Sequence, residues 1–149
     1  MSDEIWPDVE GGVRAWLRAD VGVAALVGTR VFLAMPVETK TKALVWPLAV
    51  VSRIGGGDTP GSLVPVDNAL VSIECWGELD DQGRPFWRDL TAVVNSVRSA
   101  LGRIDGRTAL APGVAAFGVS VAGVVRAPDP NNGRPRYVIT AEVTAMATT

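Results

Sequence analysis

The feature that most constrains this fold is a helical repeat of apolar residues, flanked by segments with the two-residue repeat of a strand. In residues 85–103 an apolar side chain recurs every three or four positions, which predicts an amphipathic helix with one buried face. Pro85 suits the first turn of this helix, and Gly102 or Gly106 suits its end. The apolar stripe consists of Phe86, Leu90, Val93, Val94, Val97 and Leu101.

Five segments are predicted to be strands, because apolar and β-branched residues dominate them and turn residues bound them. In one of them Val71, Ile73 and Cys75 alternate with Ser72 and Glu74, so the strand has one apolar face and one polar face. The last two are joined by a loop in which Asn132-Gly133 is a strong hairpin signal. The predicted strands are residues 30–34, 48–54, 69–76, 114–126 and 136–146.

The first thirty residues predict a helix followed by a short second helix. Asp8 is a candidate N-cap, and an apolar stripe follows it at Val9, Val13, Trp16 and Leu17. Asp20 begins a short apolar helix that Gly28 ends.

The order of these elements predicts a single domain over residues 1–149. Its class is α+β, with a mostly antiparallel sheet of four to five strands and two main helices packed on one face.

The composition of the chain excludes several classes of function. The net charge of −2 provides no clustered positive field, which argues against nucleic-acid binding as the main function. No apolar run approaches the roughly 20 residues of a membrane helix, and the acidic start MSDEIWPDVE does not resemble a signal peptide. The single cysteine cannot form an internal disulfide. We therefore expect a cytosolic, unprocessed protein with no membrane partner.

The run Gly55-Gly56-Gly57 follows an apolar strand, as a phosphate-binding loop would. However, no lysine follows the glycines, Pro60 and Pro65 prevent a helix, and no third glycine completes a dinucleotide motif. We expect instead a long hairpin arm at residues 55–68. Its apolar stretch Leu63-Val-Pro-Val66 would be poorly buried in a monomer and would pack against a neighbouring subunit.

Few residues have the features of a catalytic group. The chain has no histidine, which removes the commonest general base and most zinc sites. Cys75 is expected to be a buried structural thiol, and Glu78, Asp80 and Asp81 to form a solvated turn that caps the next helix. We predict no enzyme activity, no cofactor and no metal, although a pair of carboxylates brought together by the fold stays possible.

The order and spacing of these patterns resemble the tail terminator, or tail completion, proteins of long-tailed bacteriophages. The resemblance rests on the passage Ala19-Asp-Val-Gly-Val-Ala-Ala-Leu-Val-Gly-Thr-Arg-Val-Phe32, on the aromatic-proline pair Trp46-Pro47 before a strand, and on the helix at 85–103. It implies a homo-oligomeric ring, typically a hexamer, at the head-proximal end of the tail in the virion, assembled in the host bacterial cytoplasm. The ring ends polymerisation of the major tail tube protein and joins the head-tail connector protein, and DNA passes through it without specific binding.

The expected subunit and tube contacts lie on the arm and the last hairpin. They are Arg53, Asp58, Leu63, Val64, Val66, Arg126, Asp129 and Arg134. Arg126, Arg134 and Arg136 could also touch phosphate, although a charged hairpin tip around Asp129 is the simpler interpretation. Two other functions stay open: a head-tail joining or minor tail protein, and a small-molecule or peptide binding module.

Overall fold

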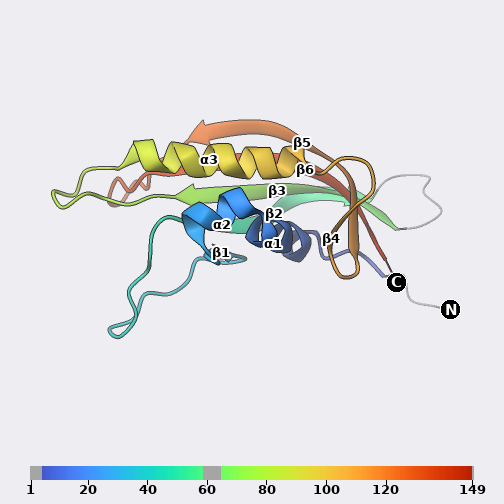
Figure 1. Cartoon of the computed structure of the whole chain (residues 1–149), viewed down its shortest axis with the longest axis horizontal. Coiled ribbons are helices and arrows are strands. Elements are labelled where there is room, and N and C mark those ends of the chain that lie inside the picture. The colour runs from blue at the N-terminus through green and yellow to red at the C-terminus, as the bar shows by residue number, and fades with distance from the viewer. Residues whose placement is uncertain (1–4, 59–64, 149) are drawn as a thin grey trace.

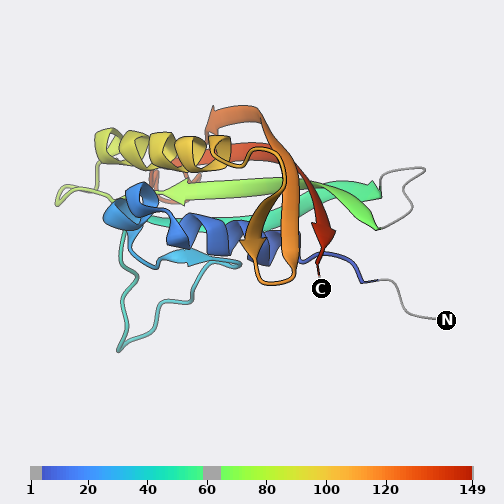
Figure 2. The same cartoon turned by 45° about the vertical axis from the view of Figure 1, so that its right-hand side comes forward.

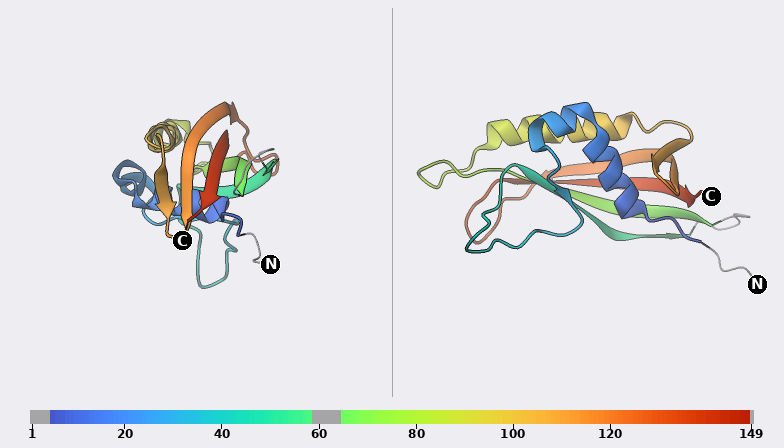
Figure 3. Two further views of the ribbon diagram at one scale, coloured as in Figure 1. Left: turned by 90° about the vertical axis from the view of Figure 1, so that its right-hand side faces the viewer. Right: turned by 60° about the horizontal axis from the view of Figure 1, so that its bottom comes forward.

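The computed structural model describes residues 5–58 and 65–148, and it has the predicted α+β class. A sheet of six strands has the order β1-β2-β3-β6-β5-β4. All the helices of the described residues lie against one face of this sheet, and none of them covers the opposite face (Figures 1 and 3). The elements are α1 Val9–Ala19, α2 Val21–Val27, β1 Val31–Phe32, β2 Leu48–Asp58, β3 Val66–Trp76, α3 Trp87–Gly102, β4 Thr108–Ala111, β5 Val114–Arg126 and β6 Arg136–Ala147.

The first helix forms as its sequence predicts. The Asp8 carboxylate caps it by accepting a hydrogen bond from the Gly11 N–H at 3.1 Å. Val9, Val13 and Leu17 are buried against the sheet. The Trp16 indole N–H donates to the Ala100 carbonyl of α3 at 2.8 Å, so α1 and α3 are joined across the same face of the sheet.

The main helix has the predicted stripe, with a later start. Leu90, Val93, Val94, Val97 and Leu101 are buried, and each contributes roughly 1.5–3 kcal/mol of burial free energy. The prediction that Pro85 begins the helix and that Phe86 lies on its buried stripe is wrong. Phe86 is the N-cap, it is 46% exposed, and its N–H donates to the Glu78 carbonyl at 3.0 Å. That bond holds residue 86 in the preceding turn, outside the first helical turn.

The strands β3 and β6 form the centre of the sheet and pair along their whole lengths, from Val66↔Met146 to Trp76↔Arg136. Their alternation is as predicted. Ala69, Val71, Ile73 and Cys75 of β3, with Ile139, Ala141, Val143 and Ala145 of β6, are buried beneath the helices.

The described parts of the predicted arm at residues 55–68 are mostly strand. The strands β2 and β3 stay paired to Asp58↔Asp67, with a register shift between Arg53 and Gly55. Just beyond this irregularity Gly56, which pairs with Ala69, has φ +90°, and a Cβ there would lie 1.9 Å from the Asn68 carbonyl oxygen. The glycine run therefore permits a bulge in a hairpin.

The two edges of the sheet differ most from the prediction. The first strand is only Val31–Phe32, shorter than the predicted 30–34, and it pairs with β2 in parallel. The sixth strand, β4, was not predicted, so a sheet of four to five strands is wrong. It forms a hairpin with the start of β5, and Leu110 and Val114 pack on Gly12 of α1. This corner curls forward over α1 and closes one end of the core (Figure 2).

Candidate interaction surfaces

The middle of the sheet face without helices is polar, whereas Leu48, Val50 and Trp76 form a small apolar cluster with Phe32 and Trp46 at the loop end of that face. Strand alternation places Ser72 and Glu74 of β3 and Thr140, Glu142 and Thr144 of β6 on this face, which is opposite the buried residues. The Thr144 hydroxyl donates to the Asn68 side-chain oxygen at 2.8 Å across two strands. The only cation that the described strands place here is Arg136, and it pairs with Glu74 at 3.6 Å. The balance of charge on this face is therefore slightly acidic.

At the end of the sheet where loops 33–47, 77–86 and 127–135 gather, arginines stack on aromatic rings. Arg126 lies 3.6 Å from the centroid of Trp87, and Arg134 lies 3.9 Å from that of Trp46. Arg136 lies 4.8 Å from the centroid of Trp76. Such contacts fix the guanidinium planes and are each worth about 0.5–1 kcal/mol at exposed sites.

These contacts change the interpretation of the last hairpin. Arg134 also donates to the Gly77 carbonyl at 3.3 Å, and so it ties the 127–135 loop to the end of β3. The Asp129 carboxylate accepts from the Asn131 N–H at 2.8 Å and orders its own turn. The three arginines do not gather around Asp129, because each packs on a different ring, but Arg134 does lie beside Asp129, whose N–H donates to the Arg134 carbonyl at 2.9 Å.

The opposite end of the sheet holds the hairpin of β2 and β3. Arg53 and Asp67 form an ion pair through the two terminal guanidinium nitrogens, with Arg53 Nη2 and Asp67 Oδ1 2.7 Å apart. Asp67 is only 3% exposed, and the pairing raises the pKa of Arg53 further above its ordinary value. Arg53 therefore stabilises the hairpin, although its own side chain is partly accessible.

The predicted interface residues thus fall into two groups at opposite ends of the sheet. Arg53, Asp58 and Val66 belong to the β2–β3 hairpin, whereas the other group borders the loop end (Figure 1). That second group is Arg126, Asp129 and Arg134. Leu63 and Val64 lie outside the described residues.

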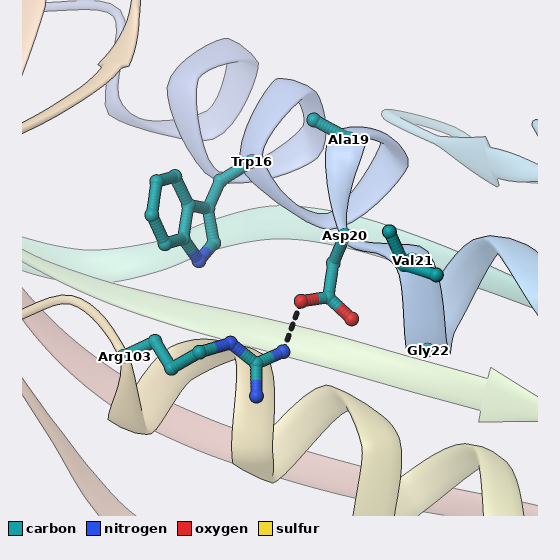
Figure 4. A pocket seen from close by; sticks show the side chains of 6 residues that line it. All are labelled: Trp16, Ala19, Asp20, Val21, Gly22 and Arg103. Atoms are coloured by element: carbon teal, nitrogen blue, oxygen red, sulfur yellow. Dashed lines mark hydrogen bonds and ion pairs between the residues drawn. The ribbon is translucent and has the colours of Figure 1, made fainter.

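A shallow groove lies between the α1–α2 junction and the end of α3. It is lined by Trp16, Ala19, Asp20, Val21, Gly22 and Arg103 (Figure 4). Asp20 caps α2 by accepting from the Val23 N–H at 3.0 Å, and it pairs with Arg103. Burial favours a higher pKa for Asp20, but these two partners outweigh it and hold the pKa below its ordinary value. The carboxylate is thereby fully engaged in joining the helices.

The remaining chemical candidates have structural surroundings. Cys75 is completely buried, and burial raises the pKa of its thiol to about 12, so it is a poor nucleophile. Asp80 accepts from the N–H groups of Gln82 and Arg84 and pairs with the Arg84 side chain. It orders its own turn and leaves α3 without a side-chain cap, which corrects the prediction that this acidic turn caps the helix.

Within residues 5–58 and 65–148, no group of three His, Cys, Asp or Glu side chains is placed to hold a metal ion. None of the helices in this part of the chain has the length and apolar character needed to cross a membrane.

Sequence reasoning missed the exposed apolar residues on the sheet edges. Ile54 of β2 is 55% exposed, and Phe117 and Val125 of β5 are 40% and 60% exposed. One signal was available: from Val114 to Val125 the sequence has no charged residue, which is unusual for a solvated edge strand.

Comparison with known proteins agrees with this fold. The family model described as tail completion protein gp17 matches residues 11–144. Among solved structures, a chain from "Virion of native gene transfer agent (GTA) particle" is similar in fold, with a TM-score of 0.61 and 18% identity. The similarity covers 93% of this chain and 94% of that one. No curated protein matches the chain. The chain belongs to the tail completion protein family and is a structural tail protein.

Proposed function

We propose that the protein forms a ring of identical subunits on the head-proximal end of the tail tube. There it ends polymerisation of the major tail tube protein and joins the head-tail connector protein. Family membership and the likeness in fold to a chain of a gene transfer agent virion support a tail role. The proposed chemistry is complementarity of surfaces.

The observation that most supports a ring with a channel is the contrast between the two faces of the sheet. One face is covered by helices, whereas the middle of the other carries the at least partly exposed side chains of Thr140, Glu142 and Thr144. The one cation that the described strands place there, Arg136, is paired with Glu74. In the proposed ring the polar face lines the channel. Unpaired cations there would hold DNA phosphates, so a slightly acidic lining lets DNA slide through without specific binding.

The two groups of expected contact residues fit two different partners. The β2–β3 hairpin with Arg53, Asp58 and Val66 lies at one end of the sheet, and the arginine-aromatic loops lie at the other. If the strands run roughly along the channel, one end of each subunit meets the tube and the other meets the connector. Trp and Arg are enriched in the energetically dominant parts of interfaces, which favours the loop end as one of these surfaces.

A capping assay tests the function. Purified protein is added to polymerising tail tube protein, and tube lengths are measured by electron microscopy. We expect short tubes with added density at one end, and free tube growth would overturn the proposal. Binding to the connector alone would support the head-tail joining alternative, and a monomer that binds a small molecule or peptide would support the binding module.

A shortened hairpin tests the proposed contact residues separately. Removal of residues 57–66, which include Leu63 and Val64, is expected to weaken ring formation and capping while the core of the domain stays folded. Circular dichroism and thermal unfolding provide the folding control. A shortened protein that still forms rings and caps tubes as well as the full chain would remove the hairpin from the interface.

A further inference from the structure

Both margins of the sheet have long stretches without a partner strand. In the described part of the chain, β1 covers β2 only at Ala49 and Val50, so the outer edge is free from Val51 to Asp58. Similarly, β4 covers β5 only up to Ala116, and the edge is free from Phe117 to Arg126. These two stretches, the β2 edge and the β5 edge, lie on opposite margins of the sheet (Figure 1).

Edge strands are often protected from pairing with another chain by lysine, proline, other charged side chains or bulges. Here the edges carry bulges and a few charges, Arg53 and Asp58 on β2 and Arg126 at the end of β5. Residues 51–58 and 117–126 contain no lysine and no proline. The exposed Ile54 lies on the β2 edge, and the exposed Phe117 and Val125 lie on the β5 edge. Each edge therefore combines free backbone hydrogen-bonding groups with apolar side chains that a partner strand would cover.

The directions of the strands specify how two copies would fit. Pairing is antiparallel between β2 and β3, between β3 and β6, and between β6 and β5. Three reversals make β5 antiparallel to β2 within one subunit. If the sheet of one copy continues into the next, its β5 edge meets the β2 edge of that copy in the antiparallel direction, and all helices stay on the same side.

We propose that copies of this chain join head to tail, with the β5 edge of one subunit paired in antiparallel with the β2 edge of the next. This inference rests on the proposed ring and names the surfaces that would form it. A contact between two different surfaces of identical subunits produces a closed ring when the rotation between subunits closes.

Bulges supply the curvature that closure needs. Register shifts lie between Arg53 and Gly55 in β2, and between Ala116 and Gly118 and between Val121 and Gly123 in β5. A bulge bends its strand and increases the local twist, so a sheet continued through these edges curves instead of extending flat.

Cysteine cross-linking tests the pairing, because the natural Cys75 is fully buried and gives little background. Ile54→Cys and Ser120→Cys are prepared singly and together, because Gly55 and Ser120 are level across the sheet through Leu70 and Glu142. Each is treated with a short bismaleimide at high protein concentration and on tail tubes. We expect no covalent product from either single variant and only dimers from a mixture of the two. The double variant should give a ladder that stops at the size of the ring. Val21→Cys, on the 84% exposed Val21 of α2, is the matched control and should stay monomeric.

The outcomes separate this inference from the proposed function. Rings seen by light scattering with no ladder from the double variant would overturn the edge pairing and leave the ring intact. Covalent dimers formed by one single variant alone would show that two identical edges meet, and would also overturn the proposed pairing of the β5 edge with the β2 edge. If neither rings nor a ladder form, on tubes or in solution, both proposals are overturned.

Discussion

The glycine run in β2 gives the sharpest test of how this sequence specifies its fold. Gly56 has φ +90°, and an added Cβ would lie 1.9 Å from the Asn68 carbonyl oxygen and 2.8 Å from the Leu70 nitrogen. Both contacts are with backbone, which cannot move without breaking the pairing of β2 and β3. The next residue, Gly57, has no atom within 4 Å of the same position. The two glycines are therefore a matched pair of test positions: a side chain at Gly56 would clash with backbone, whereas a side chain at Gly57 would meet open space.

We expect Gly56→Ala to lower the free energy of unfolding by about 2–4 kcal/mol, from the strained φ and the displaced backbone together. Gly57→Ala should be neutral, or should stabilise by up to about 1 kcal/mol because it restricts the unfolded chain. At roughly 2–4 °C per kcal/mol, the first variant should lose roughly 4–16 °C of melting temperature.

Denaturant unfolding followed by tryptophan fluorescence measures the global effect, and hydrogen exchange in residues 65–70 measures opening of the hairpin. Equal stability and equal exchange in the two variants would refute the inference that the strand pairing beside the bulge requires glycine at position 56. That result would also leave the glycine run at residues 55–57 without a structural explanation.

Three further changes test other parts of the fold. Val94→Asp places an unpaired charge in the core and should lower the free energy of unfolding by several kcal/mol. The control Asn95→Asp, on the exposed side of the helix, should lower it by less than about 0.5 kcal/mol. Equal melting temperatures for the two variants would show that Val94 faces solvent. Asp67→Asn removes the partner of Arg53 and should lower the free energy of unfolding by about 1–2 kcal/mol, after allowance for the 32% exposure of the arginine side chain. An unchanged urea midpoint would contradict this. Because the pKa of Asp20 is lowered in the fold, its contribution is present above its unfolded pKa and is lost as the pH falls through the lower folded value. The wild type should therefore lose more stability between pH 5 and pH 2 than Asp20→Asn, and parallel pH profiles would contradict this.

Much of the fold was predictable from local patterns. The caps Asp8 and Asp20 and the stripe from Leu90 to Leu101 are set by residues a few positions apart, and the structure has them as predicted. The strand Val114–Arg126 was also predicted with its observed bounds. These elements form where sequence periodicity and tertiary packing favour the same conformation.

The errors occurred where a distant partner decides the local conformation. Glycines disfavour strands, yet Gly55 to Gly57 extend β2. They do so because β3 lies beside them, and its pairing with β2 continues after the bulge between Arg53 and Gly55. The strand β4 is too short for a periodic signal, although Pro112-Gly113 is a turn signal that could have indicated its hairpin with β5. Phe86 fits the helical period, but a hydrogen bond to Glu78 holds it outside the helix.

The interface was less predictable than the fold, because binding surfaces are formed by three-dimensional neighbours. The arginines of the last hairpin had been grouped by their closeness in sequence, whereas each of Arg126, Arg134 and Arg136 stacks on a different tryptophan. The free edges could not be located without the order of the strands. Only the absence of charge from Val114 to Val125 was visible in the sequence.

The central claim is that this chain acts as a closed ring of copies of itself on the end of a tail tube. Cryo-electron microscopy of capped tubes, with the mass of the free protein measured by light scattering at high concentration, tests it most directly. The account predicts one ring at one end of each tube, with a mass near six times 15.6 kDa if the subunit number is that of a hexamer. Tubes with bare ends, beside a protein that stays monomeric at every concentration, would contradict it.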